Sequence, residues 1–444
     1  MPGVVSAAAE KTAPAGGLKR GVGLLDLVML GAGTAIGAAI FTVLGPAAKV
    51  GGTGILITTI LAVAPMALFA LVYAWLASTA PRTAASYEWQ RQFTHPAFAF
   101  AIVWLRVLAN AVVMIVYGQT LTNYLSMVID LPAKPVMFGF FAVLFALNYV
   151  GVAVAARVQT ALMLMLLVVL ALLVGASGPQ LKPQLFSEAL AGGWLPIAAA
   201  LPLMIQLFLG IETATEVGEE VADARRVVPL GVAGALALTL VVYLAVAFAA
   251  LSLVGAPALA ASKAPLLDAA KAAVGPWATP VIVAAATLAL SKSMNATFLV
   301  FSRFLFAMGR AGALPPALAR IHPRFGTPHI ATITAFAAAC AALLLPSSLL
   351  FLLLAVSVPT MLKYAGTCVA AWNAADQPDV RAEARLRFSA GLVKALAAAG
   401  VVAAVVIAAL GVSTDARPYG LLAGWLAVGL AYYFWMQRPR AQRT

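Results

Sequence analysis

The sequence predicts an all-α polytopic membrane protein with twelve transmembrane helices. Of its 444 residues, 63% are hydrophobic and only 10% are charged, whereas soluble domains carry about 25% charged residues. The apolar residues form long continuous runs, which favours helices over the alternating strands of a membrane β-barrel. This composition excludes a soluble globular enzyme, and it also excludes a disordered chain.

Hydropathy divides the chain into twelve apolar segments separated by polar loops. The first five are expected at 22–48, 53–78, 97–129, 135–152 and 158–177. The next five are expected at 194–218, 227–253, 276–308, 329–345 and 348–374, and the last two at 392–412 and 418–436. Several segments exceed the roughly 20 residues that cross a bilayer, so tilted or broken helices are expected.

The distribution of basic residues predicts the orientation. The chain has 28 Lys and Arg against 15 Asp and Glu, a net charge of +13. With both termini in the cytoplasm, 19 basic residues fall in cytoplasmic segments, five in outer loops and four in or beside spans. Positive charge gathers on the cytoplasmic side of membrane proteins. We therefore expect a multi-pass protein of the cytoplasmic (inner) membrane with both ends inside, and no nucleic-acid partner.

The termini and cysteines carry little chemistry. Residues 1–20 are rich in Ala, Gly and Pro without an apolar core, which predicts a disordered cytoplasmic tail rather than a signal peptide. Residues 438–444 form a basic cytoplasmic tail. Cys340 and Cys368 lie in apolar stretches without CxxC spacing or a nearby His, so core packing is expected. No metal site and no cofactor are expected.

The first span contains three glycines, Gly31, Gly33 and Gly37, in seven residues. Each glycine costs roughly 1 kcal/mol of helix propensity, so the helix is expected to unwind there. Close helix packing of the GxxxG type is the alternative.

The sixth span is also interrupted, because Pro202, Gln206, Gly210 and Glu212 lie within eleven residues. Corresponding breaks in the two halves of a chain indicate an inverted-repeat transporter. The half-helix N-terminus after Gly37 would offer free N–H groups to a carboxylate, and freed carbonyls would suit an ammonium group. Such a site recognises an amino acid by its backbone ends.

Three stretches resemble the amino acid–polyamine–organocation (APC) superfamily of amino acid permeases. They are GAGTAIGAAIF at 31–41, Gly210-Ile211-Glu212 with the loop 219–229, and Ser302-Arg303 with the loops 307–315 and 326–328. The resemblance covers roughly residues 20–375. It implies the leucine-transporter fold, with a five-plus-five inverted repeat, broken helices 1 and 6, and two additional C-terminal helices. The first repeat would span 21–178, the second 190–375, and helices 11 and 12 would span 390–437.

The resemblance also implies a substrate site at the two breaks. The substrate carboxylate would meet the backbone of 36–39, and the ammonium would meet carbonyls near Ala35, Gln206 and Phe208. Phe208 or Leu209 could cover the substrate, although a packing role is an equal alternative. The expected substrate-binding residues are Ala35, Ile36, Gly37, Ala38, Ala39, Gln206, Phe208, Leu209 and Gly210.

Lys292 is the most informative charge inside a span, because an ionisable residue there costs about 2.5–3.5 kcal/mol. In sodium-coupled members of this fold, this stretch of span 8 supplies hydroxyl ligands to a sodium ion. We therefore expect the Lys292 ammonium to replace that ion, with the carbonyls of Gly33 and Ile36 and the hydroxyl of Ser291 as partners. Snorkelling or a structural pair is the alternative.

The other charged residues in or near the spans are expected to have less specific roles. Glu212 is expected either to couple conformational changes or to cap the second half-helix. Arg106 and Lys363 are expected to snorkel or to form structural pairs rather than to contact substrate. Asp26 is expected to close an inner gate with a basic residue such as Arg303. The acidic and basic run at 216–226 is expected to form a solvated, salt-bridged loop.

The sequence thus predicts a sodium-independent secondary transporter of amino acids or small amines that works by alternating access. It would be a proton symporter, an exchanger or a facilitator, with small neutral amino acids as the default substrate. The alternatives are an amine, polyamine or organic-cation exchanger of the same fold, or a channel. A membrane-embedded enzyme is disfavoured because the histidines, His95, His322 and His329, all lie in or beside cytoplasmic loops.

Overall fold

The protein is helical throughout the part that the computed structural model describes, which is residues 21–262, 264–345, 349–410 and 416–437. The two predicted tails, 1–20 and 438–444, lie outside the described residues. Within the described residues, eight helices are long and apolar enough to cross a membrane by length and composition. Two isolated β-bridges, Val22 with Val221 and Thr83 with Val217, supplement the helices.

Every range predicted as a span contains helix. The first five ranges contain α1 (Leu24–Ala35), α2 (Ala38–Thr42), α3 (Leu44–Gly51), α4 (Ile55–Leu61), α5 (Val63–Thr79), α7 (Pro96–Leu125), α8 (Ala133–Val150) and α9 (Val152–Ala176). The next five contain α11 (Trp194–Ile205), η4 (Gln206–Phe208), η5 (Ile211–Thr215), α12 (Ala224–Ala261), α14 (Ala278–Arg310), α15 (His329–Ala342) and α16 (Leu349–Ala374). The last two are α18 (Ala390–Leu410) and α19 (Arg417–Gln437).

Short helices fill the connections. They are η2 (Gly52–Gly54), α6 (Ala85–Phe93), η3 (Gly178–Gln180), α10 (Leu185–Ala191), η6 (Gly218–Glu220), α13 (Pro265–Val274), η7 (Gly275–Trp277), η8 (Pro316–Ala319) and α17 (Pro378–Glu383). Helix α12 extends beyond its predicted end at 253 and kinks at Gly255, where φ is +77°. A positive φ is readily adopted by glycine, which lacks a Cβ.

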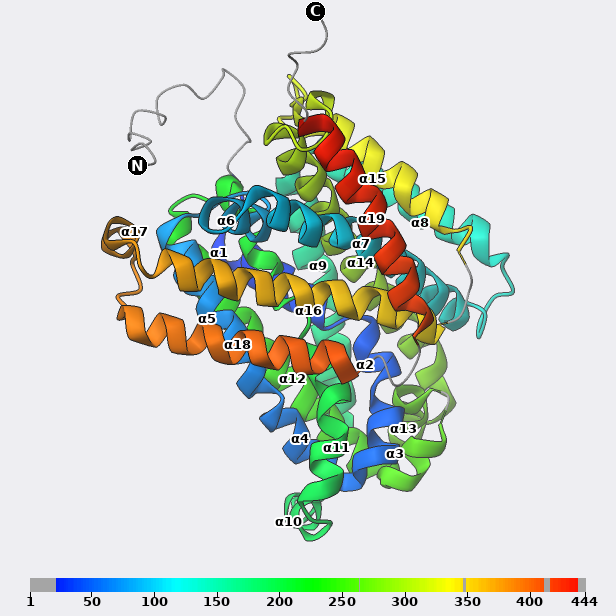
Figure 1. The fold of residues 1–444 in the computed structure, drawn as a ribbon. Coiled ribbons are helices and arrows are strands. Elements are labelled where there is room, and N and C mark those ends of the chain that lie inside the picture. Colours follow the sequence, from blue (N-terminus) through cyan, green and yellow to red (C-terminus); the bar gives the residue numbers. More distant parts are fainter. Residues whose placement is uncertain (1–20, 263, 346–348, 411–415, 438–444) are drawn as a thin grey trace, which may run out of the picture.

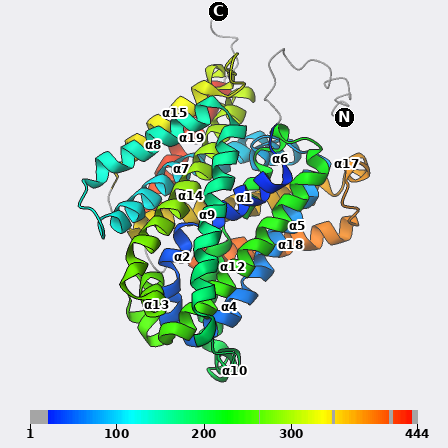
Figure 2. The ribbon, with the colours of Figure 1, turned by 180° about the vertical axis from the view of Figure 1, so that it is seen from behind.

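Helices α1 and α14 lie at the centre of the fold. Helix α1 packs against α12, α9, α14 and η5, and Figure 2 shows it from behind among α9, α12 and α14. Every residue of α14 from 289 to 309 is buried. Helices α7 and α16 pack against each other and against the core, while α18 and α19 cover them from outside (Figure 1). Lys292 and Arg303 on α14 and Lys363 on α16 are therefore held inside the protein, whereas Arg310 at the end of α14 is exposed.

The loop after the sixth span is built into the fold, which corrects the expectation that it is solvated. The backbone N–H of Gly218 donates to the Arg82 carbonyl over 3.2 Å, and that of Gly21 donates to the Glu220 carbonyl over 3.1 Å. Glu216 and Glu220 are fully buried because each has polar partners inside the protein. Only the far end of the run, around Asp223, is exposed.

The expected gate between Asp26 and Arg303 is wrong. Arg303 pairs with Glu220, whereas an Asp26 carboxylate oxygen accepts a hydrogen bond of 2.8 Å from the Thr160 hydroxyl. Burial explains the difference, since the Arg303 side chain is completely enclosed and requires a carboxylate that is enclosed with it.

Candidate substrate site

The first span is broken at Ile36 and Gly37, between α1 and α2. Ile36 has φ −78° and ψ 75°, which is not helical, and α2 begins at Ala38. The break releases the Ala35 carbonyl, which accepts a hydrogen bond of 2.5 Å from the Tyr243 hydroxyl on α12. A buried carbonyl needs such a partner once its helical bond is lost. The predicted unwinding is therefore present in the structure.

Gly37 is required by the close approach of α14. A Cβ at Gly37 would lie 1.8 Å from the Ser293 Oγ, far inside any contact distance. Close helix packing, the alternative to unwinding, thus occurs at the same residues. The two interpretations of the glycine cluster are both correct, because the unwound segment is also the contact segment.

The sixth span is broken at Leu209 and Gly210. Helix α11 and the turn η4 end there, and the chain continues as the 3₁₀ turn η5 rather than as a second α-helix. Gly210 has φ +103°, and a Cβ on it would lie 2.3 Å from the Thr34 Cγ2 of α1. The two breaks are consequently packed directly against each other.

Lys292 bridges α14 to the break in the first span. Its side chain is fully buried, and its Nζ donates to the Gly33 carbonyl over 2.9 Å and to the Ile36 carbonyl. The expected contact of Lys292 with the Ser291 hydroxyl is not found among the described residues. The Ser293 hydroxyl instead donates to the same Gly33 carbonyl, over 3.0 Å. Two positions along a helix turn the side chain by about 200°, so the two serines cannot face α1 together.

A cavity of about 310 Å³, here called the central cavity, lies between the two breaks and helices α7, α14 and α16. Five of the predicted substrate-binding residues line it, namely Ala35, Ala39, Gln206, Leu209 and Gly210. Ile36, Gly37 and Phe208 are buried outside its wall, and the Ala38 side chain lies outside the described atoms. Phe208 packs instead against the Tyr243 ring, with centroids 6.1 Å apart.

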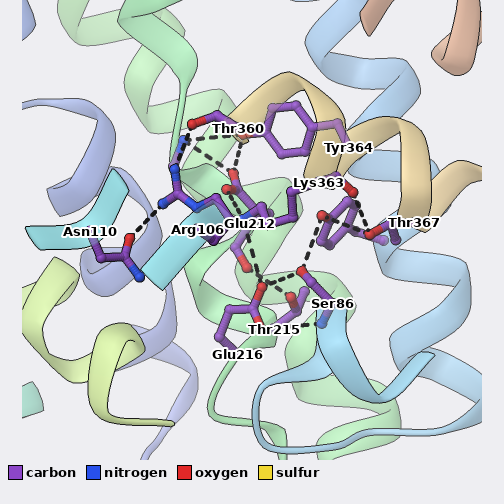
Figure 3. A network of polar contacts seen from close by, with 12 residues as sticks. Ser86, Arg106, Asn110, Glu212, Thr215, Glu216, Thr360, Lys363, Tyr364 and Thr367 are labelled. Carbon is purple, nitrogen blue, oxygen red and sulfur yellow. Dashed lines mark hydrogen bonds and ion pairs between the residues drawn. The ribbon is translucent and has the colours of Figure 1, made fainter. Parts of the chain in front are cut away.

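Arg106 and Lys363 line the central cavity, although the sequence favoured snorkelling or structural pairing for both. Arg106 donates from Nη1 to the Thr360 hydroxyl over 2.6 Å and from Nη2 to the Asn110 carbonyl oxygen over 2.7 Å (Figure 3). Lys363 does form a pair, as described below. Neither side chain reaches for a membrane surface, since both arise from helices in the interior of the bundle.

Glu212 ties the break in the sixth span to α16. One carboxylate oxygen lies 2.7 Å from the Lys363 Nζ, and the other accepts hydrogen bonds from the Tyr364 hydroxyl over 2.5 Å and the Gly210 N–H over 3.1 Å. Glu212 therefore caps the turn that follows the break, as one of the two sequence alternatives stated. It simultaneously contacts α16, which the sequence did not predict.

The network continues from Lys363 to Glu216, 3.7 Å away, and from Glu216 to Ser86 of α6 (Figure 3). The Ser86 hydroxyl also lies 3.2 Å from the Tyr73 hydroxyl of α5. Sequence reasoning missed these contacts, and the two that Glu216 makes, with Ser86 and Lys363, join residues 130 or more positions apart. The only sequence signal for this network was that ionisable residues occur in apolar segments. Such residues need partners inside the protein, but the sequence pattern does not identify those partners.

Comparison with known proteins decides the family. Residues 22–429 match the family described as "Amino acid permease", which is more than half of the chain. The chain belongs to the amino acid permease family of the APC superfamily. It is therefore a multi-pass membrane transporter of the amino acid permease family and not an enzyme.

Several relatives align with most of the chain. An uncharacterised transporter of Mycobacterium tuberculosis is 32% identical over 322 residues, covering 71% of this chain and 72% of its own. A branched-chain amino acid permease of Bacillus subtilis is 25% identical over 336 residues, with the same coverage. A human cystine/glutamate transporter is 28% identical over 335 residues, covering 71% of this chain and 66% of its own. The substrates in these names differ, so the comparisons leave the substrate open.

Proposed function

We propose that this permease is a sodium-independent secondary transporter of amino acids or related small amines that works by alternating access. The observation that carries the proposal is the contact of the Lys292 ammonium with the Gly33 and Ile36 carbonyls. An ammonium group and a sodium ion carry the same charge, and both are satisfied by carbonyl oxygens. A resident lysine therefore removes the need for a dissociable cation between α14 and α1.

The central cavity supports a substrate site at the breaks of the first and sixth spans. It is bordered by Ala35, Ala39 and Gly210, and its volume of about 310 Å³ lies at the lower end of the range for small-molecule sites. In our proposal the N–H groups at the start of α2 receive the substrate carboxylate. The ammonium group of the substrate would approach the Gln206 region, because the Ala35 carbonyl already accepts from Tyr243.

The proposal includes twelve spans, two inverted repeats (21–178 and 190–375), two further helices (390–437) and cytoplasmic termini. Breaks in two helices five spans apart support the repeat. The basic residues support the orientation. Reporter tags at Met1 and Thr444 are expected to be accessible from the cytoplasm, and tags on opposite sides would contradict the span count.

The coupling mechanism is proposed to be proton symport or exchange, with Glu212 linking substrate occupancy to the position of α16. The pair between Glu212 and Lys363 supports this role, because Glu212 lies at the break and Lys363 on a separate wall of the cavity. Movement of the break would necessarily strain or release that pair.

Uptake into proteoliposomes tests the proposal. Wild-type uptake should be unchanged when sodium is replaced by potassium. Lys292→Met keeps the apolar stem but removes the charge, and it takes the Lys292 donor away from the Gly33 and Ile36 carbonyls. The Gly33 carbonyl keeps the Ser293 hydroxyl as a donor, whereas the loss at the Ile36 carbonyl costs about 1–3 kcal/mol. We expect uptake to fall sharply, while the matched change Lys394→Met, at a partly exposed ion pair on α18, should retain it. Sodium-stimulated uptake, or an active Lys292→Met protein, would disprove the sodium-surrogate role.

A further inference from the structure

We infer that Arg106 makes the central cavity selective for acidic amino acids, whose side chains carry a second anionic group. The inference rests on the proposed transport function and names the substrate class of that same site. It reverses the sequence-based default of small neutral substrates, which assumed that no basic group lines the pocket. The cavity wall of the described structure carries two cationic side chains, Arg106 and Lys363, and one carboxylate, Glu212.

Lys363 is already neutralised by its neighbours. Its Nζ lies 2.7 Å from a Glu212 oxygen and 3.7 Å from a Glu216 oxygen. The Glu212 carboxylate is in turn fully engaged by Lys363, Tyr364 and the Gly210 N–H. Neither group is therefore free to attract the charge of a substrate.

Arg106 differs because its partners are uncharged. It donates to the Thr360 hydroxyl and the Asn110 amide oxygen, and among the described residues it forms no ion pair. Its Nε and the neighbouring Asn110 Nδ2 are buried donors without hydrogen-bond partners there. The two hydrogen-bond acceptors are neutral, so they hold the guanidinium in place without forming an ion pair with it.

A guanidinium held in this way matches a carboxylate in both charge and shape. The planar fork of arginine binds two carboxylate oxygens at once, and such charge-assisted bonds are about twice as strong as neutral ones. The wall around Arg106 includes Val113, Val116 and Val356, and the carboxylate that lines the described cavity, Glu212, is paired with Lys363. An apolar surrounding strengthens the attraction, because it lowers the local dielectric.

The position of Arg106 indicates which carboxylate it binds. In the proposed function the α-carboxylate meets the start of α2, whereas Arg106 projects from α7 and contacts α16. The side-chain carboxylate of an acidic amino acid would then reach Arg106. The other source of the same chemistry is the α-carboxylate of any amino acid, and the experiment must separate the two.

The experiment compares glutamate with glutamine and aspartate with asparagine, because each pair has nearly the same shape and differs in charge. Counterflow of each labelled amino acid is measured in proteoliposomes of the full chain. The wild type is expected to prefer the acidic member of each pair. Arg106→Gln should lower acidic transport by about 10- to 100-fold, the range for a lost charged hydrogen bond, and should leave the neutral member within a few-fold. Arg106→Lys should retain part of the acidic preference.

Control variants keep the result interpretable. Arg226→Gln removes one exposed positive charge outside the cavity and should leave the preference unchanged. Asn110→Asp places a carboxylate beside Arg106 and should reduce acidic transport even if Arg106→Gln does not fold.

The outcomes separate the inference from the proposed function. A wild type that transports glutamine but not glutamate overturns the inference and leaves the transport function intact. Equal loss of acidic and neutral substrates in Arg106→Gln, with wild-type-like elution and melting, assigns Arg106 to the α-carboxylate and also overturns it. Failure to transport any amino acid overturns the proposed function itself.

Discussion

Arg303 on α14 and Glu220 on η6 form a two-point ion pair that no solvent reaches. The Nε and Oε1 atoms are 3.0 Å apart, the Nη2 and Oε2 atoms are 3.1 Å apart, and both side chains have 0% exposure. The pair joins the centre of the bundle to the loop that follows the sixth span. The same loop residue accepts backbone hydrogen bonds from Gly21 and Val22, so the start of the first span is held by the same contact.

Removal of one partner of this pair should destabilise the protein strongly. Arg303→Met leaves the Glu220 carboxylate buried without its partner, which typically costs 3–5 kcal/mol, here taken as about 4 kcal/mol. We expect a clear fall in melting temperature, measured by the recovery of monodisperse protein after heating. The double variant Arg303→Met/Glu220→Gln should recover much of the loss, because no lone buried charge remains. Equal melting of the single and double variants would argue against this account.

Gly37→Ala should lower uptake, because it disturbs the contact between the break in the first span and α14. Its Cβ would collide with the Ser293 Oγ, so the break and α14 would have to separate. The combination Gly37→Ala/Ser293→Ala removes that atom and should restore part of the uptake, although the Ser293 Cβ at 2.9 Å still crowds the site. Gly139→Ala, where a Cβ meets nothing within 4 Å, is the matched control. No improvement in the double variant would place the defect elsewhere.

Tyr243→Phe should destabilise the backbone at the break in the first span, because it removes the hydroxyl that donates to the Ala35 carbonyl. The Ala35 carbonyl then keeps only the Gly37 N–H, 2.9 Å away, and the lost hydrogen bond contributes about 1 kcal/mol. Because Ala35 lines the central cavity, we expect a lower melting temperature and also a smaller rise in melting temperature when an amino acid binds. Tyr419→Phe removes a hydroxyl bond of similar length on α19 and should change only the melting temperature.

Trp104 on α7 and Trp425 on α19 should attach the last helix to the bundle. Each indole N–H donates to the backbone carbonyl of the other residue over 2.8 Å, and the rings stack with centroids 4.6 Å apart. Trp425→Phe retains an aromatic ring but loses the indole N–H hydrogen bond, which contributes about 1 kcal/mol. Trp425→Ala also loses the ring stacking. We therefore expect the melting temperature to fall in the order wild type, Phe, Ala, while the choice between acidic and neutral substrates stays constant.

Sequence alone determined the class of the molecule and the places where its helices break. Continuous apolar runs require a helical membrane protein, because only helices satisfy their own backbone in lipid. The glycines of the first span and the proline and glycine of the sixth span predict broken helices from local propensity. The contact of Lys292 with the Gly33 and Ile36 carbonyls was also predicted, but from the family resemblance, which places a sodium site between spans 1 and 8 in sodium-coupled members.

Only the tertiary structure decided how the remaining charges are paired. Lys363 meets Glu212 across 151 positions of sequence and Arg303 meets Glu220 across 83, and no periodicity encodes such distances. The direction of Arg106 likewise depends on Thr360, which belongs to a helix 254 residues away. Each side chain alone had two acceptable positions, at the membrane surface or inside the bundle. The packing of α7, α14 and α16 selected the interior, because it brings each buried charge to ion-pair or hydrogen-bond partners there.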